Sequence, residues 1–228
     1  MKKNILLVTL CSFSFYNLNA QFAYGDHWYE NPLGFEPLNL HTSMGAIVPA
    51  AVVVTCLLLT KKRPDLTDRL SIYNETGLSW GYKYPYTFIP QNNTGINFHI
   101  RKFMSIGIES TATLPRDNFN ETIGFCIRSF ARFYIIHKKK WKLYFESGGG
   151  FIYFRNEFPK PTDRDFRSGT HWNGLTKYGF GCDVRISRLT SALFGIRHLH
   201  ISNGNTMGAS RNPSHDSNGL FLGLSCKL

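Results

Sequence analysis

The stretch SALFGIRHLHIS at residues 191–202 and the stretch SNGLFLGLSCKL at residues 217–228 both repeat with a period of two. In the second stretch the even positions carry Leu220, Leu222 and Leu224, while the odd positions are small or polar apart from Phe221. Such a period predicts extended strands, in which residues two apart point to the same face. A polar segment separates the two stretches, so we expect them to pair as a hairpin.

Six further runs of this kind precede the hairpin, so we expect eight strands, at residues 70–82, 94–102, 103–113, 121–137, 140–154, 171–186, 191–202 and 217–228. One face of these runs is apolar, and the other carries charges of both signs. The charged face includes Glu75, Glu109, Glu146, Asp183, Arg128, Arg132, Lys142, Lys177, Arg185 and Arg197. This mixture is typical of the narrow lumen of a small membrane barrel whose apolar face meets lipid. A soluble β-sandwich with a polar outer face is the alternative.

The connections between the runs alternate in length. Tight turns are expected at residues 102–103, 138–140 and 187–190, and long loops at 83–93, 114–120, 155–170 and 203–216. Outer-membrane barrels have short periplasmic turns and long external loops. We therefore predict an all-β fold, an eight-stranded antiparallel transmembrane barrel over residues 70–228, with Ser202 at its external rim.

The segment before the barrel has two distinct parts. Residues 1–20 have a basic start, an apolar run and a final Ala20, which predicts a secretory signal peptide cleaved before Gln21. Residues 21–69 form an N-terminal segment that contains an apolar helix at 44–59. This helix is somewhat short for a spanning helix of about 20 residues. We interpret it as a membrane-associated or packing helix, and an inner-membrane helix is the alternative.

The net charge of +11 implies attraction to anions. The chain has no RNP, zinc-finger or helix-turn-helix pattern, so we expect no nucleic-acid partner. Lipopolysaccharide phosphates are the other candidate. The cysteines beyond the signal have no metal-type spacing, and we read them as small apolar residues, with a disulfide left open. No metal and no cofactor are expected.

Polar side chains end the first strand of the hairpin. His200 and Ser202 share a face and lie roughly 6–7 Å apart at Cα, and Asp216 opens the next run on the same parity. A hydroxyl, an imidazole and a carboxylate are the parts of an activated serine nucleophile. Spacing alone is equally met by polar side chains without a catalytic role.

The motif HISNG at residues 200–204, followed by NP at 212–213 and DS at 216–217, resembles the PagL family of outer-membrane lipid A deacylases. The resemblance implies a barrel esterase in which His200 is the base, Ser202 the nucleophile and Asp216 the acid. Asn203, with the backbone N–H of Gly204, would stabilise the oxyanion. Two positions depart from the family pattern: the acid is Asp where some members have Glu, and the usual loop glycine is Ser214.

The same resemblance suggests where the substrate lies. The acyl chain would rest on the apolar wall formed by Phe194, Ile196, Leu220 and Leu222, with His198 beside it. Loop cations would meet lipid phosphates; they are Arg155, Lys160, Arg164, Arg167 and Arg211. The implied partners are lipid A, within lipopolysaccharide, and outer-membrane lipid, and a homodimer is left open.

Two other functions fit parts of the sequence. One is a non-catalytic small outer-membrane barrel with a structural or adhesion role. The other is an inner-membrane-anchored β domain that binds an acidic ligand, which the apolar segment 44–59 and the positive charge would suit.

Overall fold

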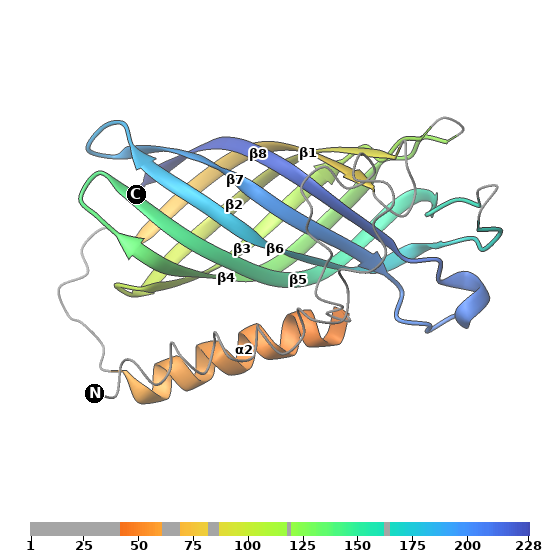
Figure 1. Cartoon of the computed structure of the whole chain (residues 1–228), viewed down its shortest axis with the longest axis horizontal. Coiled ribbons are helices and arrows are strands. Elements are labelled where there is room, and N and C mark those ends of the chain that lie inside the picture. Colours follow the sequence, from red (N-terminus) through yellow and green to blue (C-terminus); the bar gives the residue numbers. More distant parts are fainter. Residues whose placement is uncertain (1–41, 61–68, 82–86, 118–119, 162–164) are drawn as a thin grey trace, which may run out of the picture.

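The computed structural model describes residues 42–60, 69–81, 87–117, 120–161 and 165–228, with side chains from residue 50 onward. The predicted signal peptide lies outside these residues. Eight strands close into one antiparallel barrel in chain order (Figure 1). They are β1 (Leu70–Gly81), β2 (Phe88–Arg101), β3 (Met104–Thr113), β4 (Gly124–His137), β5 (Trp141–Phe158), β6 (Thr170–Arg185), β7 (Thr190–Ser202) and β8 (His215–Lys227). The predicted fold is therefore confirmed.

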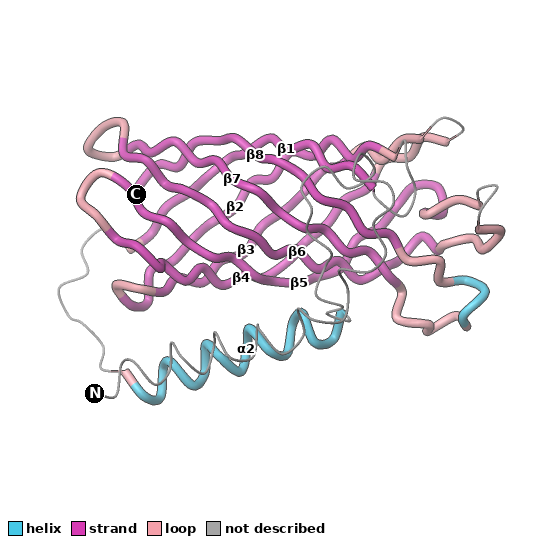
Figure 2. The backbone as a smooth tube through the Cα atoms, viewed as in Figure 1, coloured by secondary structure: helices cyan, strands magenta, loops and turns pink. Residues whose placement is uncertain are grey.

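Closure is made by the last strand, which pairs with the first. Ser71 lies opposite Lys227 and Gly81 opposite Ser217, so the β1–β8 seam is continuous over its whole length. The tight turns gather at the end of the barrel where the chain terminates, and the longer connections gather at the other end (Figure 2). This arrangement places Ser202, at the end of β7, on the long-loop rim, as the pattern of turns predicted.

The two faces of the wall differ as expected. Large apolar side chains cover the outside, among them Ile108, Ile127 and Leu222, each more than half exposed. The middle of the lumen holds buried ion pairs. Arg128 is paired with Glu109 at 2.7 Å and with Glu146 at 2.5 Å, and Lys177 reaches Glu109 at 3.1 Å. The charged face is thus paired internally, as small barrels without a channel require.

Other members of the predicted charged face join this network or lie at its mouth. Arg197 pairs with Glu75, and Arg132 with Glu146 at 2.6 Å. Lys142 and Asp183 pair more loosely, at 3.8 Å, and Arg185 is exposed at the tight-turn rim.

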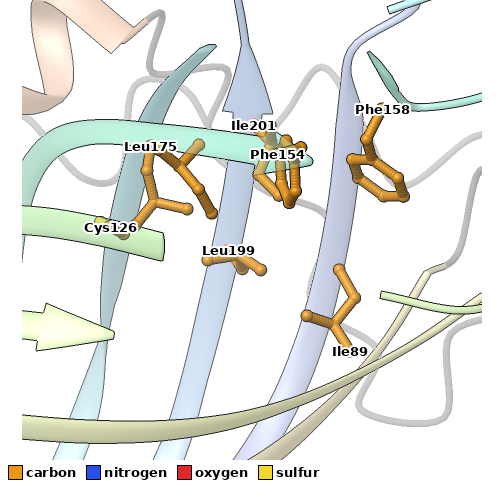
Figure 3. Packing of buried hydrophobic residues seen from close by; sticks show 8 residues of the cluster. Ile89, Cys126, Phe154, Phe158, Leu175, Leu199 and Ile201 are labelled. Atoms are coloured by element: carbon orange, nitrogen blue, oxygen red, sulfur yellow. The ribbon is translucent and has the colours of Figure 1, made fainter. Parts of the chain in front are cut away.

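Toward the long-loop rim the lumen becomes apolar (Figure 3). The buried cluster there consists of Ile89, Cys126, Ile152, Phe154, Phe158, Leu175, Leu199 and Ile201. Leu199 and Ile201 come from β7 and alternate with the outward-facing His198, His200 and Ser202. The cluster fills the barrel behind these polar residues and so fixes the strand that carries them.

Three strands are longer than predicted. β2 begins at Phe88 rather than 94, β5 continues to Phe158, and β8 begins at His215. The start of β2 lacks an apolar repeat because its outward residues Asn92 and Thr94 are polar, like Gln91 and Asn93, which are buried in the lumen. Where neither face is consistently apolar, hydrophobic alternation underestimates strand length.

The apolar segment forms helix α2 (Thr42–Leu59), which lies along the outside of the barrel (Figure 1) and contacts β4, β5, β6 and β7. Arg101, at the tight-turn end of β2, donates to Thr60 Oγ1 at 2.8 Å and to the Thr60 carbonyl at 2.9 Å. A cation at a helix C-terminus is electrostatically favourable, so Arg101 fixes this end of α2 to the barrel. Within the described residues, no helix has the length and hydropathy needed to cross a membrane.

All four cysteines in the described residues are free: Cys56 and Cys126 are buried, Cys182 is half-buried and Cys226 is exposed. Their reading as small apolar residues agrees with the burial of the first two.

Candidate active site

His200 and Asp216 are direct partners across the β7–β8 pairing. Their side chains point to the outer face, and His200 Nδ1 lies 2.6 Å from Asp216 Oδ1. A carboxylate accepts a proton from Nδ1–H, which leaves Nε2 as the basic nitrogen of the neutral ring. Asp216 lies within β8 rather than in the preceding loop, so both residues of the pair are held by strand backbone.

Ser202 is the last residue of β7 and is buried at the rim. Its hydroxyl donates to Asn212 Oδ1 at 3.0 Å and accepts from the backbone N–H of Gly204 at 3.1 Å. Within the described part of the chain, no hydrogen bond joins Ser202 to His200. The structure thus brings His200 and Asp216 into contact and places Ser202 two residues along the same face, its hydroxyl held by the loop.

Asn212 is a site residue that the sequence analysis did not single out. Its Oδ1 accepts from both the Ser202 hydroxyl and, at 3.2 Å, the backbone N–H of Asn203, while its Nδ2 donates to Asn205 Oδ1 at 2.9 Å. The NP dipeptide at 212–213 was the available signal, but no sequence pattern placed it beside Ser202. The loop between β7 and β8 folds back to do so through the short 3-10 helix η2 (Ala209–Arg211).

The side chain of Asn203, predicted to stabilise the oxyanion, is hydrogen-bonded to the surrounding loops in the structure. Its Nδ2 donates to the Arg211 carbonyl at 2.7 Å and to Thr170 Oγ1 at 3.2 Å, and its Oδ1 accepts from the Asn205 N–H at 3.0 Å. In this arrangement the side chain shapes the loop. Gly204 has its N–H beside the hydroxyl of Ser202, and a φ of 64° permits this turn.

Ser214, which departs from the family's usual glycine, adopts a φ of 53°. This left-handed conformation favours glycine and is uncommon for other residues. The turn that a glycine would make is therefore present here, and it leads directly into His215 and Asp216.

His198 lies two residues before His200 on the same face of β7 and forms a second polar pair, with Asn218. Its Nδ1 lies 2.9 Å from Asn218 Oδ1, its Nε2 lies 3.5 Å from Asp216 Oδ1, and its ring stacks obliquely with Tyr178 at 4.8 Å. His198 is buried. Asp216 thus faces two imidazoles, and His198 helps to fix its carboxylate.

The predicted apolar wall continues below these residues. Phe194, Leu220 and Leu222 are exposed on the outer face, and Ile196 is half-buried. In the described residues, no group of three or more His, Cys, Asp or Glu side chains is arranged to hold a metal.

Two of the predicted loop cations, Arg211 and Arg167, form ion pairs and hydrogen bonds within the loops. Arg211 pairs with Glu157 and donates to the Gly169 carbonyl at 3.0 Å. The hydrogen bond from Arg211 holds the pKa of Glu157 below its ordinary value. Arg167 pairs with Asp165 at 2.6 Å and donates to the Asn212 carbonyl at 3.2 Å. Both arginines therefore hold the loops around the site together.

The remaining predicted cations have fewer described contacts. Arg155 is exposed and Lys160 half-buried, while Arg164 lies outside the described residues.

The model of the family PagL, lipid A 3-O-deacylase, matches residues 74–225. This match covers most of the chain and includes His200, Ser202 and Asp216. The chain belongs to the PagL family. It is therefore an outer-membrane β-barrel of the lipid A deacylase class, and its apolar outer face is lipid-facing. No curated protein matches the chain.

Solved structures resemble it in fold. The crystal structure of the outer membrane enzyme PagL is 14% identical, with 69% of this chain and 99% of that one covered and a TM-score of 0.46. Neisserial surface protein A is 10% identical, with 70% and 96% covered and a TM-score of 0.48. A de novo designed transmembrane β-barrel is 10% identical, with 74% and 100% covered and a TM-score of 0.39.

Proposed function

We propose that this PagL-family protein hydrolyses an ester-linked acyl chain of lipid A by a triad of Ser202, His200 and Asp216. The observation that supports it most is the 2.6 Å contact between His200 Nδ1 and Asp216 Oδ1 on the outer face, two residues from Ser202. The family's description points to the 3-O ester as the bond that is cleaved.

The reaction has two stages. Ser202 Oγ attacks the ester carbonyl while His200 Nε2 accepts the hydroxyl proton, and the imidazolium then protonates the departing sugar oxygen as the ester C–O bond breaks. Water, deprotonated by His200, next attacks the acyl-serine. The imidazolium returns the proton to Ser202 Oγ as the acyl C–O bond breaks, which releases the fatty acid and restores the Ser202 hydroxyl. Asp216 holds the Nδ1–H tautomer and stabilises the imidazolium in both stages.

For the base to act, the Ser202 hydroxyl must turn from Asn212 toward His200. This turn is a rotation about the Cα–Cβ bond of Ser202, and it exchanges the hydrogen bond to Asn212 for one to His200. In the structure Asn212 Oδ1 thus holds the Ser202 hydroxyl away from His200.

The oxyanion is stabilised by donors at the loop. The Gly204 N–H, already 3.1 Å from Ser202 Oγ, is the closest donor among the described residues, and the Asn203 N–H, which donates to Asn212 Oδ1 in the structure, lies next to it. Loss of one such donor typically costs about a hundredfold or more in rate.

The surroundings suit a glycolipid in the outer leaflet. The apolar outer face around the site, which includes Phe194 and Leu220, would meet the acyl chains of the lipid, while the sugar phosphates face the loops that carry Arg155 and Arg211. No metal or cofactor enters these steps. The proposed homodimer stays a prediction.

Lipid A mass spectrometry tests the proposal in a lipopolysaccharide-producing host that expresses the protein. Wild-type protein is expected to remove one acyl chain, and Ser202→Ala to leave lipid A intact while still inserting as a folded barrel. The matched control is Ser110→Ala, at an exposed serine on the outer face of β3, which should behave as wild type. Intact lipid A with folded wild-type protein would favour a non-catalytic structural barrel instead.

A further inference from the structure

The lipid-facing wall carries a notch of small residues on two neighbouring strands. β4 presents Ser129 and Ala131 between Ile127 and Phe133, and β5 presents a matching pair between Phe145 and Phe151. The matching pair is Ser147 and Gly149, and Ser129 lies opposite Gly149, as Ala131 does opposite Ser147. The outer surface of the barrel is therefore recessed at these four small residues, because the flanking outward residues on both strands are large.

Helix α2 covers this notch without filling it. A cavity of about 490 Å³ lies between Ala50 and Val53 of the helix and the notch, with Ile96, Phe98, Ile106 and Ile108 along one side. Ala131 and Ser147 are only 3% and 4% exposed, although both belong to the outer face. The cavity volume lies within the roughly 300–1,000 Å³ of pockets that hold small ligands.

No charged side chain lines the cavity, and its other lining residues are glycines, Ser129, Phe130, Ala131 and Ser147. Such a lining offers no charge to a phosphate and only the two hydroxyls of Ser129 and Ser147 to a sugar. An extended hydrocarbon chain is the ligand that it suits, because burial of methylene groups is favourable by about 0.8 kcal/mol each.

The notch connects to the proposed active site along one row of the sheet. His200 on β7 lies opposite Thr176 on β6, Thr176 opposite Gly149 on β5, and Gly149 opposite Ser129. Neighbouring strands are about 4.8 Å apart, so Gly149 lies roughly 10 Å from His200. Thr176, which lies between them, is fully buried and does not line the cavity, so a chain that spans this distance must displace what covers Thr176.

Thr176 gives an independent sign that this path is built for a ligand. It is 0% exposed on the outer face, and its hydroxyl has no hydrogen-bond partner among the described residues. A buried hydroxyl without a partner is unfavourable, whereas one near the ester end of a bound lipid can donate to a polar group there.

We propose that the space between α2 and the notch is the subsite for the acyl chain that is cleaved. The ester lies at Ser202, the chain crosses Thr176, and its distal part enters the cavity beneath Ala50 and Val53. Helix α2, fixed by Arg101 at its C-terminal end, is the outer wall of the subsite. This inference rests on the proposed esterase function, and it implies selectivity for long acyl chains, since a short chain does not reach the notch.

Chain-length selectivity tests the proposal. The rate ratio for p-nitrophenyl dodecanoate over p-nitrophenyl butyrate is measured with the purified full chain in detergent. Ala131→Leu and Val53→Phe fill the cavity from its two sides, and each is expected to lower the ratio roughly tenfold or more, as for apolar pockets that lose room. Ala112→Leu, at an exposed outer position of β3, is the matched control and should keep the wild-type ratio.

Photo-crosslinking separates failure of this subsite from failure of the esterase. Ser202→Ala protein in vesicles is labelled with a diazirine fatty acid, and peptides from α2 and β5 should carry label that Ala131→Leu reduces. An unchanged rate ratio in the variants, or label spread evenly over the barrel wall, overturns the subsite. Absence of hydrolysis by wild type with label still confined to α2 and β5 overturns only the catalytic proposal.

Discussion

His200 Nδ1 and Asp216 Oδ1 lie 2.6 Å apart because their backbones are direct partners across β7 and β8. Directly opposite residues have Cβ atoms about 4.5–5.5 Å apart, which a short carboxylate can bridge to an imidazole. This relationship explains how Asp216 reaches His200 where some family members carry the longer Glu. The strand register, rather than side-chain length, brings the two side chains together.

Asp216→Asn should leave the barrel intact and reduce lipid A deacylation by roughly 10³–10⁴-fold, because an amide does not hold the required His200 tautomer. Initial rates on lipid A in detergent micelles measure the effect, with heat-modifiable gel mobility as the check on folding. Residual activity near wild type would rule out Asp216 as the acid. His198→Gln is the companion variant, and its loss should be much smaller.

Asn212→Ala removes the acceptor for the Ser202 hydroxyl and for the Asn203 N–H. The turnover number should fall by about a hundredfold, because Ser202 and the Asn203 N–H are then no longer held in position and a small misplacement of reacting groups can cost this much. Steady-state kinetics on a p-nitrophenyl ester report it. Asn92→Ala, on the outer face of β2 and distant from the loop, is the control; equal losses in the two variants would show that the effect is not local.

Glu109→Ala should destabilise the barrel by about 3–5 kcal/mol, because it leaves Arg128 and Lys177 buried with fewer partners. The temperature at which the folded band disappears on a semi-native gel measures the loss. Glu121→Ala at an exposed rim position should change stability by no more than about 0.5 kcal/mol. If both variants melt alike, the lumen network does not stabilise the fold.

Acid pH should loosen the loops around the site through Glu157. Arg211 holds the pKa of Glu157 below its ordinary value, so the stabilising pair is complete above that ordinary value and is lost as pH falls through the lowered pKa. Limited proteolysis with pepsin across acid pH should cut the connection between β7 and β8 faster as pH falls. Glu157→Gln should weaken this dependence, and an identical profile in the variant would contradict the prediction.

The strands were predictable wherever the outer face alternates with a polar or charged inner face, as in β7 and β8. The start of β2 was not, because Asn92 and Thr94 on its outer face are polar, like Gln91 and Asn93 on its inner face, so no apolar repeat appears. The turns and the external position of Ser202 also followed from sequence, since loop lengths alternate across a closed barrel.

The site was predictable in part. His200, Ser202 and Asp216 share a parity, and their motif resembles that of a known family. Asn212 could not be assigned, because its contact with Ser202 depends on how residues 203–214 fold back over the rim. The notch beneath α2 was equally hidden, since Ser129 and Gly149 become neighbours only through the register of β4 and β5.

The sequence by itself determined that this chain forms a closed, lipid-embedded barrel with a hydroxyl, an imidazole and a carboxylate on one face, because side-chain alternation is a local property of the strand. Tertiary structure alone decided which atoms meet: Asp216 at Nδ1 of His200, Asn212 at Ser202, and α2 over the small residues of β4 and β5. These contacts join segments far apart in the chain, and their geometry depends on register, loop conformation and helix docking, none of which a local pattern encodes.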